Sequence, residues 1–121
     1  MDSLNANEVV ENFGNNNDIS VLRDIIVDIM QPDKIILFGS YAYGTPNRDS
    51  DVDFLVIKNG VAHTLDTEAA LTTELFFRKK ALGITLVCDT FLETDESALE
   101  ISKRGGSYVD ALTKGKIIYA R

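Results

Sequence analysis

The sequence predicts one mixed α/β (α+β) domain in which a small mixed sheet packs against helices. Short apolar runs bounded by Pro, Gly or Asp are typical of buried strands. Between them lie longer segments whose apolar residues recur every three or four positions, as on one face of a helix. The 121 residues are 45% hydrophobic and 26% charged, which is ordinary for a single domain with one core.

The first helix is predicted from Asp18, a candidate N-cap, to the residues before Pro32. Its apolar face would be formed by Ile19, Leu22, Ile25, Ile26, Ile29 and Met30. Residues 1–17 are polar and rich in Asn, so we expect a mobile N-terminal segment ahead of a domain that spans 18–121.

Two predicted strands flank a polar loop. The run Ile35–Phe38 reads as a strand buried on both faces and ends at Gly39. A short helical turn over 40–43 and a loop over 44–50 follow, and the second strand begins at Asp51. The remaining elements are expected as a helix over 66–82, a strand over 84–88, a helix capped by Thr94, a helix over 108–114 and a strand over 116–119.

The first strand leads into a candidate phosphate-binding turn. Gly39 has no Cβ, so its backbone can approach a ligand closely. Ser40 offers a hydroxyl and a backbone N–H at a helix start, where unpaired N–H groups and a partial positive charge favour phosphate. By itself a Gly-Ser pair after a strand is common and need not bind anything.

Asp51 and Asp53 form a candidate metal site. At positions i and i+2 of a strand their side chains share one face, with Cα atoms about 6.5–7 Å apart. Val52, Phe54 and Val56 then point to the opposite face. Paired carboxylates repel each other unless a cation lies between them, and their hard oxygens suit Mg²⁺. A solvated Asp-x-Asp is the simpler alternative, but beside a phosphate-binding turn the pair predicts phosphoryl or nucleotidyl transfer, with one or two Mg²⁺ ions.

The motif Gly39-Ser40, ten residues, Asp51-x-Asp53 resembles the signature of the DNA polymerase β-like nucleotidyltransferases. The fuller string Gly-Ser-Tyr-Ala-Tyr-Gly…Ser-Asp-Val-Asp-Phe-Leu-Val resembles the minimal nucleotidyltransferase (MNT) branch, the antitoxins of HEPN/MNT toxin–antitoxin systems. The resemblance extends from about Val21 to Tyr119. It implies the polymerase β-like nucleotidyltransferase fold, with Gly39 and Ser40 binding nucleotide and Asp51 and Asp53 acting as catalytic metal ligands.

The resemblance also raises a question about a third carboxylate. In the family pattern a third aspartate lies near the start of the third strand, and aligning Ile84-Thr85-Leu86-Val87 with that strand puts Thr85 at its position. Asp89 is the nearest carboxylate and would lie about 13 Å farther along the strand. Family members also often carry arginine where this chain has Tyr43.

Two functions therefore remain open at the level of sequence. By resemblance, the chain is an adenylyltransferase that moves AMP from ATP to a hydroxyl, often a tyrosine of a HEPN-domain toxin partner, because the chain is too short to hold its own acceptor domain. Alternatively, with Thr85 and Tyr43 at those positions, it is a catalytically weakened module that binds nucleotide or neutralises a HEPN toxin by complex formation. Transfer to a small molecule such as an aminoglycoside is a third possibility, known from larger chains.

Composition limits the other possibilities. The net charge of −7 disfavours direct nucleic-acid binding, which needs a basic face, and is compatible with a protein partner. No apolar run is long enough to span a membrane, no secretory signal is visible, and the single Cys88 rules out a disulfide framework, so we expect a cytoplasmic protein. Arg48 and the lone His63 are interpreted as loop residues, although Arg48 could touch a phosphate.

Overall fold

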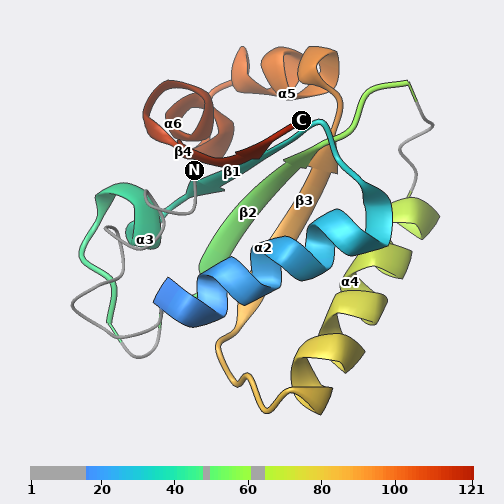
Figure 1. Ribbon diagram of the computed structural model, residues 1–121. Helices are drawn as coiled ribbons and strands as arrows, with labels where there is room; N and C mark the ends of the chain where they lie inside the picture. Colours follow the sequence, from blue (N-terminus) through green and yellow to red (C-terminus); the bar gives the residue numbers. More distant parts are fainter. Residues whose placement is uncertain (1–15, 48–49, 61–64) are drawn as a thin grey trace.

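The computed structural model describes residues 16–47, 50–60 and 65–121, and within them four strands form one mixed sheet in the order β3-β2-β1-β4 (Figure 1). The strands are β1 (Lys34–Phe38), β2 (Val52–Ile57), β3 (Cys88–Glu93) and β4 (Lys116–Ala120). Strand β1 pairs antiparallel with β2 and β4, whereas β2 and β3 run parallel. The predicted fold class, a small mixed sheet packed against helices, is confirmed.

Helices cover both faces of the sheet. They are α2 (Asn16–Met30), α3 (Ser40–Tyr43), α4 (Leu65–Ala81), α5 (Asp95–Ser102) and α6 (Ser107–Lys114). In Figure 1, α2 and α4 lie in front of the sheet, and α5 and α6 lie behind and above it. The sheet therefore has a face towards α2 and α4 and an opposite face towards α5 and α6.

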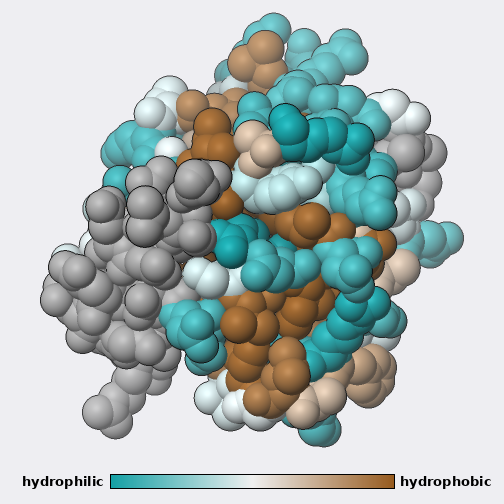
Figure 2. Space-filling model, in the orientation of Figure 1, coloured by the Kyte–Doolittle hydropathy of each residue, from teal (hydrophilic) through white to brown (hydrophobic). Residues whose placement is uncertain are grey.

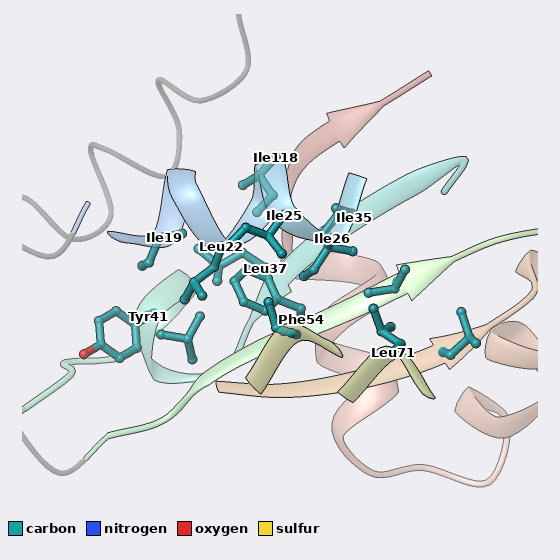
Figure 3. Close-up of a cluster of buried hydrophobic side chains, with 14 of the residues drawn as sticks. Ile19, Leu22, Ile25, Ile26, Ile35, Leu37, Tyr41, Phe54, Leu71 and Ile118 are labelled. Atoms are coloured by element: carbon teal, nitrogen blue, oxygen red, sulfur yellow. The ribbon is translucent and has the colours of Figure 1, made fainter. Parts of the chain in front are cut away.

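The larger core fills the face covered by α2 and α4. Figure 3 shows the apolar side chains of α2 pointing towards those of the strands, among them Ile35, Leu37 and Phe54. Val52, Phe54 and Val56 of β2 all belong to this core, as the alternation of the sequence predicted. Apolar surface is also left exposed on this side of the molecule, as Figure 2 shows.

A smaller core lies on the opposite face. It contains Ile36 and Phe38 of β1, Leu55 and Ile57 of β2, and Ala98 and Ala111 of α5 and α6. Because β1 and β2 are buried on both faces, each reads as a continuous apolar run instead of an alternating one. That is why the sequence predicts both strands well.

Two predicted boundaries are wrong. Asp18 is not an N-cap, because α2 begins at Asn16 and Asp18 lies in its first turn. The third strand is not at 84–88: β3 begins at Cys88, and residues 84–87 precede the sheet, with one backbone hydrogen bond from the Val52 N–H to the Val87 carbonyl at 2.9 Å. In that segment Ile84 and Leu86 pack on the larger core while Thr85 is exposed, so the segment has the apolar alternation of a strand without being one.

The helix ends follow the predicted chemistry. Thr94 caps α5 in a capping box with Ser97, and Gly83 follows α4 with a φ of 75°. The basic residues late in α4 are used within the fold: Arg78 pairs with Asp28 and Glu74, and Lys79 Nζ donates to the Leu86 carbonyl. Residues 1–15, Arg48 and His63 lie outside the described residues, so the predictions made for them stay predictions.

Candidate active site

The predicted phosphate-binding turn and one of the predicted metal ligands meet at one end of the sheet. Strand β1 ends beside the start of β2, because the two strands are antiparallel and Phe38 pairs with Asp53. Gly39, the next residue, has φ 77° and ψ −158°, a conformation that is essentially restricted to glycine. A Cβ built on Gly39 would overlap Asp53 Oδ2, so glycine is required here by backbone conformation and by close approach.

The turn at Ser40 packs on the larger core, and its first N–H groups lie ahead of the first intrahelical hydrogen bond. The N–H groups of Ala42 and Tyr43 donate to the Gly39 carbonyl at 3.0 and 3.1 Å, so the N–H groups of Ser40 and Tyr41 precede the first intrahelical bond. Tyr41 and Ala42 are buried, which fixes the turn against the domain. The roles of Gly39 and Ser40 in binding an anionic group stay a prediction.

Asp53 lies on the face of the sheet that α5 and α6 cover. Its neighbours Val52 and Phe54 point into the larger core, whereas Asp53 is half-buried beside Phe38 and Phe91 of the smaller one. Asp51 precedes β2 by one residue and is exposed. Asp53 therefore lies on the predicted face, opposite Val52, Phe54 and Val56. Asp51 lies just outside the strand.

The expectation for the third carboxylate is wrong. Residues of β2 and β3 pair in parallel register, with Val52 opposite Cys88 and Asp53 opposite Asp89. Asp89, and not Thr85, therefore lies directly beside Asp53. The error has a physical cause: residues 84–87 look like a strand in the sequence, but pairing begins only at Cys88, four residues further on than predicted. The Cys-Asp-Thr-Phe-Leu-Glu sequence of β3 is less apolar than its neighbours because β3 is an edge strand.

The carboxylates influence one another. Burial, followed by the negative charges of Asp89 and Asp51, raises the pKa of Asp53 to about 6. A cation at this position would relieve both the repulsion and part of the desolvation cost. Burial also raises the pKa of the neighbouring Cys88 thiol to about 11, which keeps it protonated and unreactive at neutral pH.

The chemistry of this donor set fits a divalent cation that prefers oxygen ligands. Asp51, Asp53 and Asp89 come from the starts of two adjacent strands, next to a turn suited to phosphate. Within the described part of the chain, no three acidic, His or Cys side chains are placed so that they could hold a metal ion together.

The side chain of Tyr43 lies next to a lysine. Lys114 Nζ of α6 lies 5.3 Å from the centre of the Tyr43 ring, at a distance typical of a cation–π contact. The position at which the family often has arginine thus carries a positive charge from elsewhere in the chain. This contact could not be predicted from the sequence, because it joins residues of separate elements.

A cavity of ≈ 320 Å³ opens beside Asp53. Its lining includes Phe38, Asp53 and Phe91 of the sheet and Ile101, Ser107 and Tyr108 of α5 and α6. This cavity was not predicted, because it depends on how the α5–α6 corner lies over the sheet.

No helix of the described residues has the length and apolar character needed to cross a membrane.

Comparison with known proteins finds a family model and similar solved structures. Residues 19–118 match the model of the family described as nucleotidyltransferase domain. Among solved structures, the chain is similar to one titled as a mutant of the toxin-antitoxin MntA-HpeT, with 26% sequence identity over 88% of this chain and 73% of that chain and a TM-score of 0.49. A search of curated proteins gives no match.

Proposed function

The chain belongs to the nucleotidyltransferase domain family, and we propose that it transfers AMP from ATP to a hydroxyl group in a Mg²⁺-dependent reaction. The observation that carries the proposal is the register of Asp53 with Asp89, beside the Gly39 turn. Three aspartates and a phosphate-binding turn at one sheet end are the parts that nucleotidyl transfer needs.

Each residue has a distinct part in this proposal. The backbone N–H groups at the start of α3 and the Ser40 hydroxyl hold the outer phosphates of ATP. Asp51, Asp53 and Asp89 hold one or two Mg²⁺ ions, which would offset the charge of the triphosphate and of the group being transferred. Asp89 also accepts the proton of the attacking hydroxyl, because it lies beside Asp53 on the edge strand β3, on the side away from β1.

The acceptor we propose is a tyrosine of a HEPN-domain toxin, which would make this protein an antitoxin. The support is the resemblance of Gly39-Ser40-Tyr41-Ala42-Tyr43-Gly44 and Ser50–Val56 to the MNT branch. The alternative of a catalytically weakened binding module rested on Thr85 at the third-carboxylate position and on Tyr43 in place of arginine. The register of Asp89 beside Asp53 argues against the Thr85 part, and the Tyr43 part still favours the alternative.

The test uses the full chain, Mg²⁺, ATP labelled at the α-phosphate and the HEPN protein encoded next to it. We expect the partner to gain mass in whole units of AMP, and Asp53→Asn to abolish this labelling. A stable complex without any labelling by the wild type would favour neutralisation by binding alone. Labelling that survives Asp53→Asn at the wild-type rate would remove Asp53 from the site.

A further inference from the structure

The cavity beside Asp53 has aromatic walls contributed by three separate elements. Phe38 ends β1, Phe91 lies in β3 two residues after Asp89, and Tyr108 lies in the first turn of α6. The ring centres of Phe38 and Phe91 are 5.8 Å apart, and Tyr108 meets both edge-on at 6.4 and 6.3 Å. Such contacts stabilise a fixed arrangement of rings.

Hydrogen bonds fix the position of Tyr108 in the cavity wall. Its hydroxyl donates to Glu93 Oε2 at 3.0 Å, and Ser97 donates to the other carboxylate oxygen of Glu93 at 2.7 Å. Ser97 is itself fixed in the capping box of α5. Burial, reinforced by Glu93, raises the pKa of Tyr108 above its usual range, so the phenol stays protonated and remains a donor. Tyr108 is therefore built in as a wall of the cavity.

The cavity differs from an ordinary surface hollow because a carboxylate lies at its edge. Phe38, Phe91 and Ile101 make most of the lining apolar, while Asp53 is the acidic residue that contributes to it. An occupant would need an apolar, planar body and a polar atom directed at Asp53. A hydroxylated aromatic ring has both properties.

We propose that this cavity receives the aromatic ring of the acceptor, so that the phenolic oxygen of the acceptor faces Asp53 and Asp89. The inference rests on the proposed function and assigns its acceptor a binding place in this cavity. In the transfer step, the phenolic oxygen forms a bond to the α-phosphorus of ATP. The bond from that phosphorus to pyrophosphate breaks, and the phenolic proton passes to the Asp89 carboxylate.

The cavity fits the ring of the acceptor better than the adenine of ATP, because the two rings lie at different distances from the reacting atoms. In a phenol the attacking oxygen is attached directly to the ring, so a ring in contact with Asp53 presents its oxygen at the carboxylates. Adenine is separated from the α-phosphorus by the ribose, and a base in this cavity would draw the phosphorus away from them. The cavity's contact with Asp53 therefore fits the ring that carries the nucleophile.

The first test fills the cavity. Ile101 lines it and is 36% exposed, so Ile101→Trp should block it without disturbing the core, while Leu99→Trp on the same helix is the matched control outside the lining. We expect Ile101→Trp to raise the KM for the HEPN partner roughly tenfold or more, with the Kd for Mg·ATP unchanged. The control should match the wild type in both. A weaker Kd for Mg·ATP in Ile101→Trp would assign the cavity to the base and overturn the proposal, as would no change at all.

The second test needs no transfer activity. N-acetyl-tyrosinamide, added at millimolar concentration with Mg²⁺ and a non-hydrolysable ATP analogue, should shift the ring NMR signals of Phe38, Phe91 and Tyr108. N-acetyl-serinamide should not shift them, and Ile101→Trp should remove the response. Shifts in a wild type that labels no partner would retain the cavity and refute the proposed transfer. If Ile101→Trp leaves the transfer rate unchanged, or if the NMR shifts are confined to other residues, the proposed transfer would stand and the role of the cavity would be refuted.

Discussion

Asp53 and Asp89 occupy paired positions on neighbouring parallel strands, so their Cα atoms lie about 4.8 Å apart and their side chains leave the same face of the sheet. On its other side, Asp53 faces Gly39 so closely that no Cβ fits between them. One residue thus links the phosphate-binding turn of β1 to the third carboxylate on β3. The predictions below test this link from both sides.

Gly39→Ala should damage the fold as well as the site. The backbone conformation of Gly39 costs about 1–3 kcal/mol for any other residue, and the overlap with Asp53 adds to that cost. We therefore expect a loss of roughly 3 kcal/mol or more in the free energy of unfolding, measured by urea denaturation.

Gly106→Ala is the matched control for this loss. Gly106 has nearly the same backbone conformation, φ 92° and ψ −164°, but nothing lies within 4 Å of a Cβ built there. Gly106→Ala should lose only the part of the free energy of unfolding that comes from the backbone conformation. In a double-mutant cycle, Asp53→Ala should recover part of the additional loss seen in Gly39→Ala. Equal losses at both glycines, or additive effects in the cycle, would contradict the close approach.

Asp53→Asn should stabilise the folded protein at neutral pH. The pKa of Asp53 is raised in the fold, from 3.8 to about 6, so the ionised carboxylate opposes folding. This cost is absent below the unfolded pKa and complete above the folded one. Because Asp53 is only half-buried, solvent screening limits it to about 1 kcal/mol.

The measurement is the free energy of unfolding of the wild type and Asp53→Asn as a function of pH, without divalent cations. The variant should be more stable by about 1 kcal/mol near pH 7.5, and the difference should shrink as the pH falls through about 6 towards 4. A difference that grows on acidification would have the wrong sign and would refute the raised pKa.

Adding Mg²⁺ should stabilise the wild type and removing it should reverse the effect. A ligand at about tenfold its Kd adds about 1.4 kcal/mol to stability, which raises the Tm of a domain of this size by several degrees. The shift, followed by calorimetry with and without EDTA, should be lost in Asp53→Asn. Asp66→Asn, a change to an exposed acid in the first turn of α4, is the control and should keep it. An equal shift in all three proteins would indicate non-specific ion binding.

The elements that form the sheet centre could be predicted from the sequence because burial on both faces leaves an unambiguous apolar run. Strands β1 and β2 and the Gly-Ser turn follow from that pattern, and with them Gly39, Ser40, Asp51 and Asp53. The alternation of Val52, Phe54 and Val56 also gave the correct face for Asp53.

The third strand could not be predicted because strand pairing is not a property of one segment. Residues 84–87 alternate like a strand but lie outside β3, since β2 begins only at Val52 and its register with β3 starts at Cys88. The four-residue shift keeps Thr85 and Asp89 on equivalent sides of the chain, so pattern alone cannot separate them. The aromatic cavity was likewise unpredictable, because Phe38, Phe91 and Tyr108 meet only through tertiary packing.

The most direct test of the account compares Asp89→Asn with Thr85→Ala in the AMP-transfer assay, with Mg·ATP and partner both saturating. If Asp89 is the third carboxylate, its loss should lower the single-turnover rate about 100-fold or more, since it removes a metal ligand and the proton acceptor together. Thr85 is exposed and outside β3, so Thr85→Ala should react at the wild-type rate. Wild-type transfer by Asp89→Asn, or loss of transfer in Thr85→Ala, would contradict the site described here.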